Sequence, residues 1–397
     1  MLFRSCGLFQ GFKQLRLRNW AQPTFDPASI AAVVLTHAHI DHSGYLPLLV
    51  KRGFRGRIYC SASTAELCNI MLPDAGRLQE EEAEYANRRG FSRHKPALPL
   101  YTEKDAERAL KHFKPVAFDE SFSVGPFRVS LALAGHILGA SMISVEEGGR
   151  KLLFSGDLGR LNDPVMPPPA QPHASDVLVV ESTYGNRRHE AADPVHRLRE
   201  IIRQTVERGG IVLMPAFSVG RSQSLLHAIQ SLKAKGEIDP ALPVYLNSPM
   251  AIDATDVYLR HCGDHRLDPE ACRAMGRTAT PVNRTEDSRR LNEASGPMII
   301  IAGSGMATGG RVIHHLKAMA PDPKNTILFT GFQAGGTRGA SMVGGASSVK
   351  IHGEYVPIRA QVETIANFSA HADAEEILDW LRRFPRPPAH TYIDRKS

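Results

Sequence analysis

The sequence predicts an α/β protein with parallel β-sheet, and three observations lead to this fold class. Short apolar runs rich in β-branched residues recur along the chain, each followed by polar or glycine-rich residues. Amphipathic stretches with helical spacing lie between the later runs. The length of 397 residues leaves room for two domains, or for one domain that carries a large insertion. Alternation of strand and helix is typical of parallel sheets covered by helices.

The apolar runs have the length and composition of buried strands. They comprise residues 31–37, 128–136, 151–157, 176–183, 210–217, 243–249, 297–305 and 325–332. Helical patterns occupy residues 193–209 and 222–236, and the charged segment 77–95 is expected to form an exposed helix and loop.

Two stretches have the composition of connections between domains. Residues 159–176 are rich in proline, which removes backbone donors and predicts an irregular surface segment. Residues 335–350 are rich in glycine and serine and are expected to return the chain from one domain to the other.

Composition restricts the class of protein. Apolar residues make up 42% and charged residues 22%, as in ordinary soluble domains. The formal charge of +7 permits a polyanionic partner without requiring one. The five cysteines are scattered and include no CxxC pair, so neither a disulfide framework nor a thiolate zinc knuckle is expected. Without a signal peptide or a membrane-spanning apolar run, we expect a cytoplasmic protein with no membrane partner.

The densest cluster of chemically active side chains follows the first apolar run, in "LTHAHIDHSG". His37 and His39 lie two positions apart and suit one metal ion, while Asp41 and His42 suit a second. A loop at the end of a strand lets such side chains converge, because the strand fixes where the loop begins. Chance clustering in a polar turn is the alternative, and this spacing makes it the weaker one.

Later apolar runs end in further candidate ligands. His136 ends the run at 128–136, and Asp157 ends the run at 151–157, each in a turn that contains glycine. Either residue alone is more often a hydrogen-bonded turn residue. As members of one set, each delivered by its own strand, they become candidate metal ligands.

The segments "THAHIDHSG", "GHILGAS" and "FSGDLGR" resemble the metallo-β-lactamase superfamily. This resemblance implies a four-layer αβ/βα sandwich with metal ions at one edge of the sheets. The superfamily contains lactamases, glyoxalases, lactonases and nucleases, so these motifs indicate the kind of site better than the substrate.

Further segments resemble the β-CASP branch, whose members are nucleic-acid-processing nucleases. They are residues 179–187, 215–226, 245–251, 302–317, 331–340 and 368–378. The resemblance implies a β-CASP α/β domain inserted in the metallo-β-lactamase domain. The expected borders are 1–184 and 346–397 for the metallo-β-lactamase domain and 185–345 for the insertion.

The resemblance also implies roles for individual residues. His37, His39 and His136 would hold one zinc ion, and Asp157 would bridge to a second ion. Asp41 and His42 would ligate that second ion, and Asp41 also counts among the catalytic candidates. In the β-CASP motifs, Glu181 would support the catalytic histidine, and His371 would protonate the leaving group.

The chemistry is consistent with these residues taken alone. Two divalent ions sharing a hydroxide supply a nucleophile at neutral pH, and a histidine can protonate the leaving oxygen. The glycine-rich turn that contains Ser304 and Gly305 offers backbone N–H groups to a phosphate. Arg311 and Arg338 are further candidates for substrate contact, with a solvated surface position as the alternative for each.

Both ends of the sequence depart from the family pattern. Ser5 stands where relatives have an aspartate that braces the metal loop. Asp394 and the following residues 395–397 stand where relatives have a Val-His-Gly-Glu motif, whose histidine ligates the second metal. From these differences we expect a chain shortened at both ends, a weakened second metal site, and reduced or absent nuclease activity.

The function expected from the sequence is that of a zinc-dependent ribonuclease in RNA processing or decay, which hydrolyses phosphodiesters with a metal-bound hydroxide. The expected partner is single-stranded RNA, and a homodimer is plausible by resemblance. Endonuclease and 5′-exonuclease action both stay open, as does DNA as substrate. The first alternative is a catalytically weak RNA-binding scaffold, and the second is a metallo-hydrolase of small esters or thioesters.

Overall fold

The computed structural model describes residues 6–90, 92, 94–190 and 192–394, and the chain divides into two units. Unit 1 comprises residues 1–188 and 371–397, and unit 2 comprises residues 189–370. Ser5 and residues 395–397, on which part of the sequence prediction depends, lie outside the described residues. No helix in the described part of the chain is both long and apolar enough to cross a membrane.

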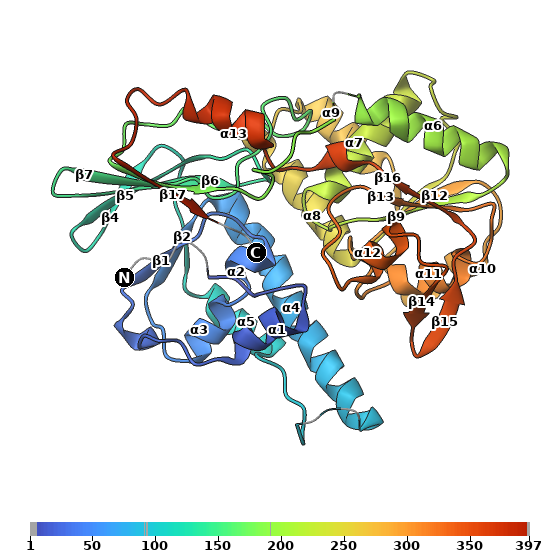
Figure 1. Ribbon diagram of the computed structural model, residues 1–397, viewed down its shortest axis with the longest axis horizontal. Helices are drawn as coiled ribbons and strands as arrows, with labels where there is room; N and C mark the ends of the chain where they lie inside the picture. The colour runs from blue at the N-terminus through green and yellow to red at the C-terminus, as the bar shows by residue number, and fades with distance from the viewer. Residues whose placement is uncertain (1–5, 91, 93, 191, 395–397) are drawn as a thin grey trace. The chain divides into compact units, whose positions relative to one another are not determined.

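Unit 1 contains two sheets flanked by helices (Figure 1). Its strands are β1 (Ala32–Val34), β2 (Arg57–Cys60), β3 (Phe113–Pro115), β4 (Ser121–Val124), β5 (Phe127–Leu133), β6 (Ser141–Glu147), β7 (Arg150–Phe154), β8 (Val177–Glu181) and β17 (His390–Asp394). Its helices are α1 (Lys13–Leu17), α2 (Ile40–Ser43), α3 (Leu46–Lys51), α4 (Ala62–Arg89), α5 (Glu103–Leu110) and α13 (Ala374–Leu381).

The two sheets of unit 1 pack face to face. A three-stranded sheet, β1-β2-β3, faces a six-stranded sheet of order β17-β8-β7-β6-β5-β4. Val34 of β1 shares a core cluster with Val129, Leu131, Ile143 and Val145 of β5 and β6. Helices α3 and α5 lie beyond the small sheet and α13 lies beyond the large one (Figure 1). These layers confirm the predicted αβ/βα sandwich.

The large sheet is mixed, which the prediction of parallel sheet did not foresee. The pairs β4–β5, β5–β6 and β6–β7 are antiparallel, whereas β8 runs parallel to both of its neighbours, β7 and β17. The turn between β6 and β7 contains Gly148 and Gly149, with φ of 56° and 79°. Consecutive positive φ values are typical of the tight turns that join antiparallel strands. The Gly-Gly pair was therefore the sequence signal for a hairpin.

Unit 2 is built around a six-stranded parallel sheet of order β11-β10-β12-β9-β13-β16. Its strands are β9 (Ile211–Pro215), β10 (Val244–Asn247), β11 (Thr280–Pro281), β12 (Met298–Ala302), β13 (Thr326–Phe329), β14 (Ser348–Ile351), β15 (Glu354–Pro357) and β16 (Gln361–Thr364). Its helices are α6 (Pro194–Glu207), α7 (Arg221–Ala234), α8 (Pro249–Arg260), α9 (Pro269–Arg277), α10 (Thr285–Glu293), α11 (Val312–Met319) and α12 (Arg338–Val343).

Helices cover both faces of this sheet (Figure 1). On one face, Ile300 and Ile327 pack against Val312 and Leu316 of α11, and all four side chains are buried. Helix α6 contacts β9 and α7. Strands buried on both faces read as continuous apolar runs, which is why the sequence located β9, β10, β12 and β13.

The glycine- and serine-rich stretch 335–350 does not return the chain to unit 1, contrary to its interpretation as a seam. It contains α12 and the first part of β14, both in unit 2. Gly336 and Gly345 on either side of α12 have φ of 81° and 83°, so these glycines serve turns. The chain re-enters unit 1 only at His371, after β16 has paired with β13.

Candidate metal centre

The loop after β1 holds His37 and His39. Leu35 still donates to the Tyr59 carbonyl of β2, and the chain then leaves the sheet and turns into α2. The Ser43 hydroxyl closes this turn by donating to the Ala38 carbonyl at 2.7 Å. The side chains of the motif therefore lie on a short, internally bonded turn at the end of a buried strand.

Backbone from the start of the described chain packs directly on this turn. The Cys6 amide donates to the His42 carbonyl at 2.9 Å. A Cβ atom on Gly7 would lie 1.6 Å from the Asp41 carbonyl oxygen, which explains a glycine at this position. The segment "CGLFQG" is thus a brace for the metal loop within the described residues.

His136 and Asp157 lie on two loops that contact each other through their backbones. Gly135 and Leu158 form a β-bridge, and a Cβ atom on Gly159 would lie 2.0 Å from the Gly135 carbonyl oxygen. Only glycine allows this approach. Gly135, next to His136, and Gly159, two residues after Asp157, thus let the two loops come together.

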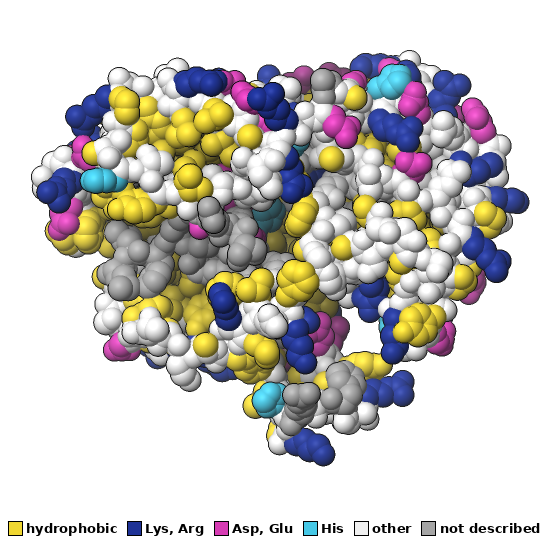
Figure 2. All heavy atoms as spheres, viewed as in Figure 1, with side chains coloured by type: hydrophobic (Ala, Val, Ile, Leu, Met, Phe, Trp, Pro, Cys, Tyr) yellow, Lys and Arg dark blue, Asp and Glu magenta, His cyan; other side chains and the backbone are white. Residues whose placement is uncertain are grey.

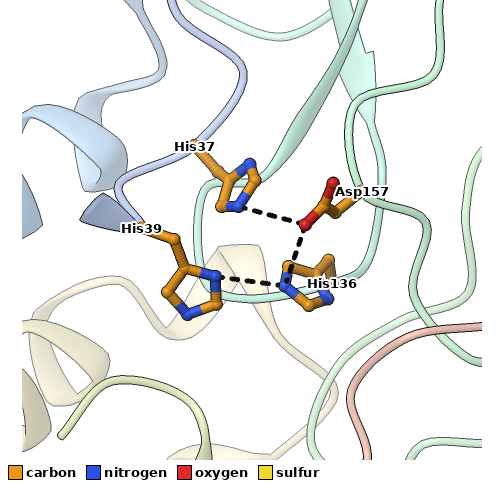
Figure 3. A group of neighbouring side chains, drawn as sticks. All are labelled: His37, His39, His136 and Asp157. Carbon is orange, nitrogen blue, oxygen red and sulfur yellow. Dashed lines mark hydrogen bonds and ion pairs between the residues drawn. The ribbon is translucent and has the colours of Figure 1, made fainter. Parts of the chain in front are cut away.

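The four side chains converge on one point (Figure 3). Asp157 Oδ2 lies 3.6 Å from His37 Nε2 and 3.8 Å from His136 Nε2. His39 Nδ1 lies 3.2 Å from His136 Nε2. One ligand atom from each residue lies within 4.8 Å of the others, and His37, His136 and Asp157 are buried.

These residues fit a metal ion. The Thr36 hydroxyl lies 3.1 Å from His37 Nδ1 and leaves Nε2 pointing into the cluster, where it has no hydrogen-bond partner among the described residues. Burial lowers the pKa of His37 well below its usual range, and desolvation lowers the pKa of His39 to about 4. Neutral imidazoles beside a carboxylate present the lone pairs that a divalent cation requires.

Asp41 and His42 lie on the other side of the same carboxylate. His42 Nε2 is 3.4 Å from Asp157 Oδ2 and 3.6 Å from Asp41 Oδ2. The Asp41 side chain is 42% exposed, whereas His42 is buried. The structure therefore gathers the other five sequence-predicted metal ligands around the sixth, Asp157, whose Oδ2 lies near both groups.

Glu181 and His371 extend this cluster. Either carboxylate oxygen of Glu181 lies 3.4 Å from His371 Nδ1, and Thr183 and Leu158 donate their backbone N–H groups to the same carboxylate. Glu181 ends β8, where a Ser155 hydroxyl accepts its amide hydrogen. The His371 ring lies 4.3 Å from the His136 ring, measured between centroids.

Tyr184 is a neighbour of this site that the sequence did not single out. Its ring stacks on that of His371 with centroids 5.8 Å apart. Tyr184 also pairs with Asp373 in a parallel β-bridge, which fixes the backbone beside His371. The signal was present in the segment 179–187, where the tyrosine follows Glu181 closely.

The four predicted substrate-binding residues lie in unit 2, around the turn after β12. The Ser304 hydroxyl is 3.0 Å from that of Thr308, and Gly305 packs so closely on Phe217 that a Cβ atom would lie 2.8 Å from its ring. Arg311 donates to Asn247 Oδ1 and to the carbonyls of residues 282 and 283. Arg338 donates to the carbonyls of residues 307, 308 and 350.

Both arginines therefore hold neighbouring backbone in place. Burial withdraws the Arg311 guanidinium from water and so lowers its pKa. From sequence, substrate contact was expected for both arginines, with a solvated surface position as the alternative. Backbone acceptors far along the chain leave no sequence signal, so this third arrangement was not foreseen.

Comparison with known proteins agrees with this architecture. Residues 6–189 match the model of the metallo-beta-lactamase superfamily, residues 222–342 match the Beta-Casp domain, and residues 355–393 match the Zn-dependent metallo-hydrolase RNA specificity domain. The chain belongs to the β-CASP family of the metallo-β-lactamase superfamily, and its class is that of metal-dependent hydrolases.

Among its relatives is ribonuclease TTHA0252 of Thermus thermophilus, which is 38% identical over 96% of this chain and 85% of that protein. Transcription termination factor FttA of Methanocaldococcus jannaschii is 30% identical over 96% of this chain. The chain spans 61% of the length of that FttA. An RNase J-like protein of the same organism is 30% identical over 92% of this chain and 81% of that protein.

Proposed function

We propose that the protein is a zinc-dependent ribonuclease that hydrolyses phosphodiester bonds at the cluster around Asp157. The observation that carries this proposal is a single carboxylate oxygen shared by two groups of ligands, with the Glu181–His371 pair beside it. Similarity to a protein named as a ribonuclease supports RNA as the substrate.

The proposed metal ligands are His37, His39 and His136 for one ion, and Asp41 and His42 for another, with Asp157 between them. When bound there, a divalent cation would supply an activated water and would offset the charge that develops on the phosphate. Imidazole and carboxylate ligands without a thiolate suit zinc among other divalent ions. The family resemblance implies two ions, and elemental analysis of the purified protein tests this number.

His371 is the proposed general acid. A Glu181 carboxylate at its Nδ1 holds the proton there and orients the ring, so Nε2 is the atom that delivers a proton to the leaving sugar oxygen. Stacking on Tyr184 restricts the tilt of the ring. Backbone donors to Glu181 in turn hold the carboxylate, which makes Glu181 a positioning residue.

Single-stranded RNA is the proposed partner. The net charge of +7 favours a polyanion, and Lys and Arg side chains are spread over the visible face rather than gathered into one patch (Figure 2). Matching of residues 355–393 to a domain described by RNA specificity supports the same choice. Cytoplasmic location and a homodimer stay predictions from sequence.

The test uses the purified full chain, loaded with Zn²⁺, on end-labelled single-stranded RNA and on a thioester of similar size. The proposal is supported if the wild-type chain cleaves the RNA but not the thioester, and if Asp157→Asn no longer cleaves the RNA. Tight RNA binding without cleavage in the zinc-loaded chain favours the scaffold alternative. Thioester hydrolysis without RNA cleavage overturns the proposal.

A further inference from the structure

A second group of metal-ligating side chains lies in unit 2, in the corner between α8 and α9. Cys262 begins the 3-10 turn Cys262–Asp264, His265 follows it, and Cys272 lies in α9. Two Sγ atoms and one imidazole nitrogen lie within 4.8 Å of one another. Cys272 and His265 are buried, and Cys262 is partly exposed.

The sulfur–nitrogen distance between Cys272 and His265 matches the one expected around a tetrahedral zinc ion. Zinc–sulfur and zinc–nitrogen bonds of about 2.3 Å and 2.0–2.1 Å give a sulfur–nitrogen edge of about 3.5 Å. Cys272 Sγ lies 3.5 Å from His265 Nε2. The Tyr258 carbonyl oxygen lies 3.1 Å from that nitrogen and 3.8 Å from that sulfur.

The Cys272 thiol holds its proton firmly. Burial, followed by repulsion from Cys262, raises the pKa of Cys272 to about 12, and Arg273 partly offsets this rise. The Cys262 thiol donates to the Leu259 carbonyl at 3.1 Å. A thiophilic cation binds the thiolate form of each cysteine and so displaces the thiol protons. Its affinity therefore depends on pH and on the short distance between the two sulfurs.

His265 has to change its tautomer to join the site. The Leu267 N–H group donates to Nδ1 at 3.2 Å, so the ring proton is on Nε2 and points at the Tyr258 carbonyl. Coordination at Nε2 moves this proton to Nδ1 and turns the Leu267 amide away, within the link that precedes α9. His265 is therefore the weakest ligand of the group, and the two thiolates contribute most of the affinity.

We propose that Cys262, His265 and Cys272 form a metal site for Zn²⁺ in unit 2, built independently of the cluster around Asp157. The ion joins the end of α8 to α9 and stabilises this corner of the unit. A thiolate-containing site of this kind is typical of structural zinc, whereas the cluster in unit 1 contains only histidine and carboxylate ligands.

The experiment loads the metal-free full chain with Co²⁺ and records the near-ultraviolet charge-transfer band that only thiolate-bound cobalt gives. The band is expected in the wild-type chain and in Asp157→Asn, and is expected to be lost in Cys262→Ser and Cys272→Ser. Cys6→Ser is the matched control, because Cys6 lies beside the unit 1 cluster, and it should keep the band. His265→Gln should retain the band but need more cobalt to reach it.

Cys262 is the decisive position if Cys272→Ser fails to fold, because its side chain is partly exposed. A zinc-dependent rise in the melting temperature of Asp157→Asn that disappears in the double variant Asp157→Asn/Cys262→Ser supports the site. Absence of the band in the folded wild-type chain overturns it. The proposal is also overturned if Cys262 and Cys272 are oxidised to a disulfide to the same extent with and without Zn²⁺. None of these readouts uses RNA cleavage, so failure of the proposed function leaves this test intact.

Discussion

Buried histidines in the two units differ in what their ring nitrogens face. In unit 1, His37 Nε2 points at a carboxylate and at other imidazoles and has no hydrogen-bond partner among the described residues. In unit 2, His315 is equally buried, but Asn247 and Asn292 lie 2.6 Å from its two nitrogens. Burial lowers the pKa of both, so desolvation does not distinguish them. The groups that face the ring nitrogens distinguish the two histidines. They indicate a binding site around His37 and a structural hydrogen-bond network around His315.

This comparison leads to opposite expectations for substitutions. Groups that face one another around Asp157 are arranged for a cation, so their loss should remove activity and leave the fold intact. Groups whose nitrogens are fully hydrogen-bonded hold the fold, so their loss should reduce stability.

The largest effect is expected for Asp157→Asn. Its Oδ2 lies within 4 Å of four histidines, namely His37, His42, His136 and His371, and an amide cannot replace a bridging carboxylate. We expect RNA cleavage to be abolished and bound zinc to fall, measured by cleavage assay and elemental analysis. Asp379→Asn, at an exposed carboxylate of α13 paired with Arg382, is the control and should behave as wild type. Cleavage by Asp157→Asn at the wild-type rate would remove Asp157 from the site.

A smaller loss is expected for His371→Ala, because the metal ligands stay in place. Losing a general acid lowers kcat by about 10²–10⁴-fold. Zinc content should stay at the wild-type value, which separates this variant from Asp157→Asn. Substrates with a leaving group that needs no proton should recover most of the rate. An exposed histidine, His173, provides the control in His173→Ala. A parallel fall in zinc content would instead make His371 a ligand.

Glu181→Gln should have a smaller effect still. Glu181 is buried and acts on His371 through its orientation, and outer partners of this kind typically contribute about 10–100-fold. The expected signature is a changed pH profile of kcat with little change in KM, because Glu181 is buried and acts through the His371 ring. An unchanged pH profile together with loss of folded protein would show a purely structural role, since Leu158 and Thr183 also donate to this carboxylate.

The cluster around Asp157 was predictable from sequence because each ligand follows a strand that the apolar pattern locates. His37 follows β1, His136 follows β5, and Asp157 follows β7. Parallel sheet in unit 2 was predictable for the same reason. The αβ/βα layering and the β-CASP insertion came from the family resemblance, which the family models confirm.

Other features depend on contacts that sequence patterns do not encode. Arg311 and Arg338 are held by backbone carbonyls far along the chain, and any residue type supplies a carbonyl. Cys262 and Cys272 escaped notice because a search for CxxC pairs excludes their spacing. Their sulfurs meet only because the turn after α8 brings the chain back onto α9.

The smallest effect on catalysis is expected at His315 in unit 2, which instead controls the pH dependence of stability. Burial, followed by the neighbouring His314 and Arg311, lowers the pKa of His315 to about 4, below its value in an unfolded chain. The unfolded state therefore binds a proton first as pH falls, so this contribution to stability is complete at neutral pH and is lost between about pH 6.5 and pH 4. The full loss is on the order of 3 kcal/mol, and about half of it is reached near pH 5.

Hydrogen exchange in α11 and β12 measures this loss locally, without requiring the two units to unfold together. His315→Gln keeps one amide partner for Asn247 and should lower the protection from exchange at pH 7. The further decrease in protection between pH 7 and pH 5 should be smaller than in the wild-type chain. His173→Gln, at an exposed histidine, should leave the wild-type slope unchanged. An equal slope in His315→Gln and the wild-type chain would mean that His315 does not control the pH response. In that case, the proposed difference between histidines that hold the fold and histidines that face a metal ion would be supported only by the variants of the unit 1 cluster. Those variants are expected to change activity and to leave the fold intact.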